Sequence, residues 1–141
     1  MQTLTRNILA VLVAAFTLAA LDFIWIGNIM KSAYITATGP VLHLAGGALV
    51  PNITATVLLY FVFTISILFW VTPRANTADG RPCYKRALFY GALFGFTLYA
   101  FYDLTNIAIL SVWPWSIALV DILWGTFLGA VGSYVIKKIL A

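Results

Sequence analysis

The residues in this sequence with the clearest capacity for chemistry are its carboxylates. There are four of them, Asp22, Asp79, Asp103 and Asp121, and the chain has no glutamate. All except Asp79 lie inside long apolar stretches, where a carboxylate in the middle of a membrane costs about 2.5–3.5 kcal/mol. Such residues persist when they face a cavity or a partner. We therefore interpret these three as candidates for cation binding, proton transfer or acid–base chemistry.

Aromatic side chains lie within four residues of each membrane aspartate, and an amide follows one of them by a single turn. Residues three or four positions apart share a helix face. An indole or phenol there can donate a hydrogen bond to the carboxylate or line a pocket beside it. The candidate pocket residues are Asp22, Trp25, Tyr99, Tyr102, Asp103, Asn106, Asp121 and Trp124.

Other chemistries find little support in the sequence. The single histidine, His43, is more typical of a surface residue than of a ligand, and Cys83 has no cysteine or histidine partner nearby. One cysteine excludes an internal disulfide and a multi-cysteine metal site. No glycine-rich phosphate loop and no H-x-x-x-H spacing occurs. We predict no metal site, and the sequence does not identify a cofactor.

The elements that must position the aspartates are membrane-spanning helices. The 141 residues are 63% hydrophobic and 9% charged, whereas a soluble domain carries about 25% charged residues. The net charge of +4 does not indicate nucleic-acid binding, because the basic residues are few and lie at the edges of apolar stretches. Four segments reach the roughly 20 apolar residues that a span needs. We predict one all-α membrane domain over 1–141, a four-helix bundle with spans at about 8–30, 52–71, 87–110 and 115–136.

The loops predict the orientation. If the N-terminus is inside, seven of the eight basic residues are cytoplasmic and only Lys31 is outside. The positive-inside rule then predicts that both termini are cytoplasmic. The segment 31–51 becomes an outer segment that lies on the bilayer, folds back over the bundle or forms a short re-entrant piece. We interpret the first span as a helix, because its apolar run is too long for a signal peptide.

The membrane aspartates fall at similar depths. At 1.5 Å per residue, Asp22, Asp103 and Asp121 lie about 12, 10 and 9 Å from the outer ends of their helices. The sequence therefore predicts a layer of carboxyls in the outer half of the bundle, forming a pocket that faces the external medium.

Glycines recur every four residues on the cytoplasmic side of this layer. Gly91 and Gly95 lie on the third span, and Gly125 and Gly129 on the fourth. Runs of small residues at this spacing let helix backbones approach closely in lipid. We predict that these four glycines pack the last two spans together and close the inner half of the bundle.

Several motifs resemble the signatures of a bacterial family catalogued as domain of unknown function 2177. They are the segments 21–27 and 102–106, Trp113-Pro114 followed by 120–125, and Pro51-Asn52 at the start of the second span. The resemblance covers essentially the whole chain. It implies a small four-helix protein of the bacterial cytoplasmic membrane, and it implies no activity.

Three functions remain open from the residues. The first is binding or transport of a cation, a proton-coupled solute or an amine-bearing amphiphile, for which four helices favour a homo-oligomer or a membrane partner. The second is an enzyme that modifies a lipid or quinone with a pair of carboxyls. The third is an accessory subunit of a larger membrane assembly, in which the aspartates are structural. We rank binding and transport first.

Overall fold

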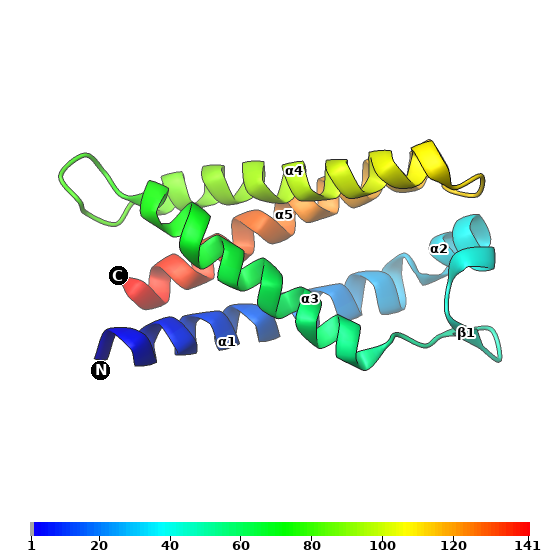
Figure 1. Ribbon diagram of the computed structural model, residues 1–141, viewed down its shortest axis with the longest axis horizontal. Coiled ribbons are helices and arrows are strands. Elements are labelled where there is room, and N and C mark those ends of the chain that lie inside the picture. The colour runs from blue at the N-terminus through cyan, green and yellow to red at the C-terminus, as the bar shows by residue number, and fades with distance from the viewer. Residues whose placement is uncertain (1) are drawn as a thin grey trace.

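Four long helices make up most of the protein in the computed structural model, which describes residues 2–141; Met1 lies outside the described residues (Figure 1). The first two long helices each end in a π-helical segment, and a short 3-10 helix, Thr72–Ala75, follows the second. The elements are α1 (Gln2–Ile24) with its π segment Trp25–Ile29, α3 (Ile53–Ser66) with its π segment Ile67–Val71, α4 (Tyr84–Ile109) and α5 (Trp115–Leu140).

Each long helix is long and apolar enough to cross a membrane. The candidate spans are Thr3–Ile29, Ile53–Ala75, Tyr84–Ile109 and Trp115–Leu140. The predicted four-helix membrane fold is therefore confirmed. Because an even number of spans returns the chain to its starting side, the two chain ends and the loop 76–83 lie at one end of the bundle (Figure 1). The α4–α5 turn lies at the other end.

The segment 31–51 folds back over the end of the bundle that carries the α4–α5 turn. It forms α2 (Lys31–Thr38), a 3-10 turn (Gly39–Val41) and a small antiparallel hairpin of β1 (Leu44–Ala45) and β2 (Ala48–Leu49). The hairpin turn uses Gly46 and Gly47, whose positive φ angles of 57° and 79° favour glycine. Of the three arrangements open from the sequence, α2 adopts the one in which it packs on the bundle, since its Tyr34 and Thr38 side chains are buried.

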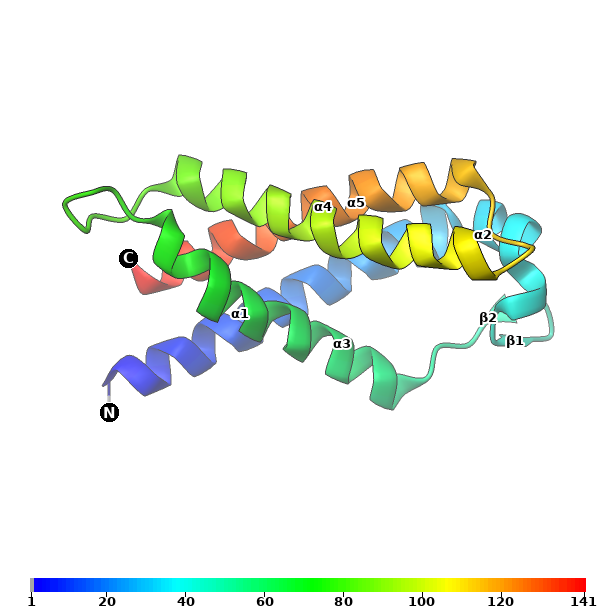
Figure 2. The same ribbon diagram turned by 45° about the horizontal axis from the view of Figure 1, so that its top comes forward.

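Helix α5 is the central element of the bundle. Figures 1 and 2 both show it running antiparallel beside α4, and it also packs against α1. Small residues on α1, among them Ala10 and Ala14, bring that helix close to the large side chains of Leu128 and Ile136 on α5. Because lipid tails are as apolar as these side chains, close packing rather than hydrophobic burial holds the helices together.

The four predicted seam glycines lie between α4 and α5. A methyl group on Gly91 would overlap the carbonyl oxygen of Gly129, and one on Gly95 would overlap that of Gly125. Ser133, one turn beyond Gly129, donates a hydrogen bond to the Ala87 carbonyl across the same interface. At Gly91, Gly95 and Gly129 the backbones therefore approach too closely for any side chain larger than hydrogen.

The end of the bundle that carries the chain ends is fastened by basic side chains. Asn76, in the loop before α4, accepts hydrogen bonds from Lys137 through its side chain and from Arg86 through its backbone. Arg6 donates to the Ile139 carbonyl at 2.9 Å. These contacts join the start of α1, the loop and the end of α5.

Candidate functional site

Asp22 joins three helices. Its buried carboxylate accepts a hydrogen bond from the Trp124 indole at 2.6 Å and another from the Tyr60 hydroxyl at 2.8 Å. Trp124 belongs to α5 and Tyr60 to α3, so donors from two neighbouring helices meet on one α1 side chain. Each carboxyl oxygen of Asp22 has a donor, and both donors are neutral.

Asp121 lies beneath α2. Its buried carboxylate accepts a hydrogen bond from the Tyr34 hydroxyl, and the Tyr34 side chain is itself buried. On α5, Asp121 lies one turn before Trp124, whose indole donates to Asp22. Helix α2 therefore covers Asp121 at the end of the bundle that the sequence predicts to be open.

Asp103 is fully buried, and only one of its two carboxyl oxygens has a hydrogen-bond partner among the described residues. One oxygen accepts a hydrogen bond from the Trp113 indole at 3.0 Å, while Oδ2 has no hydrogen-bond partner in the described chain. One turn further along α4, the buried Nδ2 of Asn106 is also without a partner. A buried polar atom left unpaired costs about 1–3 kcal/mol. This acceptor and this donor lie three residues apart on one helix.

Two tyrosines flank Asp103 in different ways. Tyr99 lies one turn before Asp103 on α4, and its ring lies where a side chain on Gly125 would have to go. Tyr102 is 53% exposed and packs edge-on against Trp113, with ring centroids 5.8 Å apart. Tyr99 therefore packs between α4 and α5, whereas Tyr102 packs on the outside of the bundle.

The two tryptophans of the D-x-x-W motifs stack on each other. The rings of Trp25 and Trp124 lie 4.5 Å apart and 8° from parallel, which makes them a face-to-face pair across α1 and α5. With Val120 and Leu123 they line an open depression of about 260 Å³, which we call the tryptophan depression. The Trp25 indole N–H is buried without a hydrogen-bond partner.

The eight predicted pocket residues thus fall into two groups, one around Asp22 and Asp121 and the other around Asp103. Asp22, Asp121 and the two tryptophans lie where α1 and α5 pack, whereas Asp103, Asn106, Tyr99 and Tyr102 lie on α4. Three donors to the carboxylates were not among the predicted residues, namely Tyr34, Tyr60 and Trp113. Tyr34 and Tyr60 lie far along the chain from the carboxyls they bond, so the spacing did not indicate them. From the sequence, Trp113 is interpreted as an aromatic residue at the membrane interface.

The cluster lacks a basic partner. The salt bridge of the described residues joins Arg81 to Asp79, in the exposed loop at the far end of the bundle. Residues 2–141 contain no group of three or more histidine, cysteine or acidic side chains that could hold a metal ion. The carboxyls are thus balanced by neutral indole and phenol donors alone.

Comparison with known proteins gives one match. The family model described as a predicted membrane protein (DUF2177) matches residues 7–136. The chain belongs to this family. The resemblance read from the motifs around the three aspartates is confirmed, and the family's description states membrane location without an activity. No curated protein matches the chain, and no solved structure matches it.

Proposed function

We propose that this membrane protein binds an amine-bearing amphiphile, with the amine at the Asp22–Asp121 pair and the apolar part in the tryptophan depression. The observation that carries the proposal is two buried carboxyls, on the packed helices α1 and α5, that have no basic partner in the described chain. The pair also lies beside stacked indole rings, and indole faces attract cations.

The electrostatics favour a positively charged ligand. Two carboxylates in a low-dielectric site do not both remain ionised without a cation, because the energetic cost of an unpaired buried charge is large. Neutral donors such as Trp124 and Tyr34 offset only part of this cost. We therefore expect an ammonium group that pairs with these carboxyls to displace a proton from them.

The surroundings favour an amphiphile over a small inorganic ion. The tryptophan depression is lined by apolar and indole side chains and opens at the surface of the bundle, and Trp124 lines it while also donating to Asp22. One side chain thus touches both the apolar depression and the carboxylate. A ligand that spans both features would carry its charge next to a hydrophobic tail.

Decylamine is a suitable probe, with decanol as its uncharged counterpart. The protein is placed in nanodiscs of uncharged lipid, and binding is followed by quenching of tryptophan fluorescence. We expect decylamine to bind at least tenfold more tightly than decanol, since a desolvated ion pair adds more than about 1.4 kcal/mol. In weak buffer, decylamine binding should release protons.

Variants at the two carboxyls test whether these side chains bind the amine. Asp22→Asn and Asp121→Asn keep the side-chain shape, and each should reduce the preference for decylamine over decanol. The matched control is Asp79→Asn, because Asp79 lies in an exposed loop at the other end. Equal binding of decylamine and decanol by the unmodified protein would refute the proposal. An equal loss in Asp79→Asn would also refute it.

The orientation is a second part of the proposal. The distribution of basic residues supports cytoplasmic chain ends and a cytoplasmic loop 76–83, with α2 facing the outside of a bacterial inner membrane. Reporters inserted in the loop and at Ala141 should read as cytoplasmic, and one in the turn 111–114 as external. A cytoplasmic signal from that turn would reverse the orientation.

A further inference from the structure

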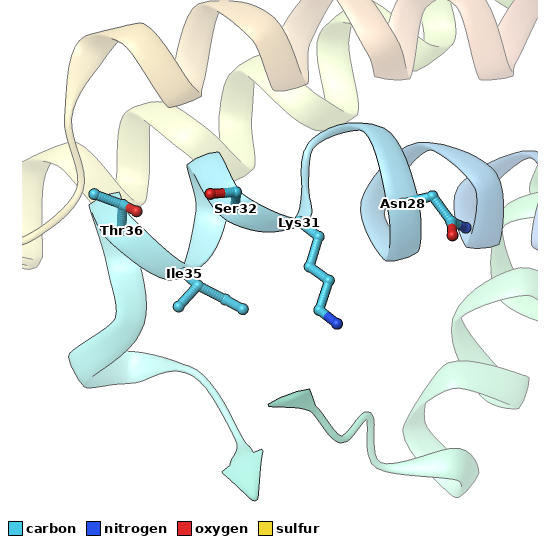
Figure 3. Close-up of a pocket in the computed structure, with 5 residues that line it drawn as sticks. All are labelled: Asn28, Lys31, Ser32, Ile35 and Thr36. Carbon is cyan, nitrogen blue, oxygen red and sulfur yellow. The ribbon is translucent and has the colours of Figure 1, made fainter. Parts of the chain in front are cut away.

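A second depression lies at the outer surface of α2, on the side away from the buried aspartates. It has a volume of about 300 Å³ and is lined by Asn28, Lys31, Ser32, Ile35 and Thr36 (Figure 3). We call it the headgroup depression. Ser32 and Thr36 lie along one edge of α2, and Lys31 and Ile35 along the other. Four of the five residues carry polar groups and one is apolar.

The depression carries the positive charge of Lys31, and no acidic side chain among the described residues pairs with it. Lys31 forms no ion pair or hydrogen bond within residues 2–141, and the hydroxyls of Ser32 and Thr36 form none either. The Asn28 amide donates to the Phe23 carbonyl at 3.0 Å, which leaves its oxygen free. No acidic residue occurs between Asp22 and Asp79 in the sequence. The Lys31 ammonium and two hydroxyls are therefore free to donate hydrogen bonds, and no carboxylate of the described residues lies within ion-pair distance of Lys31.

The depth of the depression indicates which anion is available. The candidate membrane span that contains α1 ends at Ile29, and Lys31 begins α2 two residues later. This is the level at which phospholipid headgroups lie against a spanning helix. Basic pockets at helix ends bind lipid headgroups through their phosphates.

We infer that the headgroup depression binds the phosphate of a phospholipid in the leaflet at this end of the bundle. The Lys31 ammonium supplies the charge, and the hydroxyls of Ser32 and Thr36 donate hydrogen bonds to the phosphate oxygens. Ile35 contacts the start of the acyl region. The site is separate from the carboxyl cluster, and it holds whether or not that cluster binds an amine.

The test compares two lipids that differ only in the headgroup. Protein stripped of lipid in detergent is titrated with dioleoyl phosphatidylglycerol or dioleoylglycerol, and bound lipid is counted by native mass spectrometry. We expect the phospholipid to bind more tightly, and Lys31→Gln to weaken it about fivefold, the effect of one basic residue near a charged headgroup. Binding of dioleoylglycerol should not change.

The matched control is Lys138→Gln, an exposed lysine at the other end of the bundle that lies over the Tyr134 ring. It should retain binding. A second variant, Thr36→Glu, adds a carboxylate at an exposed position of the depression and should weaken phospholipid binding at least as much as Lys31→Gln. Melting curves without lipid check that each variant is folded.

Three outcomes would overturn the inference. One is unchanged phospholipid binding in both depression variants. Another is an equal loss in Lys138→Gln, which would show a nonspecific effect of charge. The third is full displacement of the lipid by millimolar inorganic phosphate, which would make the site one for free phosphate and not for a lipid.

Discussion

Gly129→Ala should destabilise the protein more than the same change at Gly132, the α5 glycine that faces Leu18 of α1 and Ile67. A methyl group at Gly129 would meet the Gly91 carbonyl oxygen and, at 2.9 Å, both the Cα and the N of Gly95. All of these are backbone atoms of α4, which cannot move without shifting the whole helix. The added volume therefore has to separate α4 from α5.

The expected magnitude is the difference of two terms. Overpacking a tightly packed interface costs about 1–3 kcal/mol, and contact with rigid backbone on two sides places this site at the upper end. Replacing glycine by alanine within a helix returns up to about 1 kcal/mol through helix propensity. The free energy of unfolding should therefore fall by about 2 kcal/mol.

Two further glycines give a graded comparison. At Gly132 a methyl group would meet the ends of flexible side chains, Ile67 Cδ1 at 3.0 Å and Leu18 Cδ1 at 3.2 Å. At Gly27 it would meet only the Phe23 ring, at 3.6 Å, which is an ordinary contact. Alanine should therefore cost less at Gly132 than at Gly129, and at Gly27 the change should stay within about 0.5 kcal/mol.

Thermal and denaturant unfolding in detergent, followed by circular dichroism, measures all three variants on the same scale. The expected order of destabilisation is Gly129, then Gly132, then Gly27. If Gly129→Ala is as stable as the unmodified protein, α4 and α5 do not pack through this seam, and the argument from backbone contact fails.

Two other predictions concern hydrogen bonds to aspartate side chains. Trp124→Phe keeps an aromatic ring but removes the donor to Asp22, so the free energy of unfolding should fall by about 1–3 kcal/mol in the same melts; unchanged stability would contradict this. Hydrogen bonds from Thr77 and Arg81 hold the pKa of the Asp79 carboxyl below its usual 3.8. Because the folded-state pKa is the lower one, this stabilisation of the loop is complete above pH 3.8 and is lost as the pH falls through the folded value. Carbon NMR of the Asp79 carboxyl should show a midpoint below 3.8 that rises in Thr77→Ala, and a midpoint at or above 3.8 would count against the loop geometry.

The spans were predictable because lipid imposes a strong requirement. Every backbone polar group within the bilayer must be bonded inside its own helix, so a long apolar stretch has one available structure. The ends were less predictable, since a helix can continue past the apolar stretch. Helix α4 begins at Tyr84 rather than near residue 87, and α5 ends at Leu140 rather than near 136, because basic residues such as Lys85 and Lys137 continue the helix outside the most apolar region.

The hydrogen-bond partners of the aspartates were not predictable from spacing. The D-x-x-W motifs place a tryptophan one turn from each aspartate of its own helix, yet Trp124 donates to Asp22 on α1. A helical side chain of this length extends outward to a neighbouring helix, so its partner depends on which helices are adjacent. The donor from Tyr60 on α3 depends on the same arrangement, which sequence periodicity does not specify.

The most consequential difference between sequence and structure concerns α2. The sequence predicts carboxyls that open to the outside, whereas Tyr34 on α2 covers Asp121. On the same eight-residue helix, three positions earlier, Lys31 faces the headgroup depression. Anything that holds Lys31 in place therefore also holds Tyr34 over the carboxylate, because a helix of two turns moves as one body. Helix α2 thus carries residues of the headgroup depression on one side and the side chain that covers Asp121 on the other.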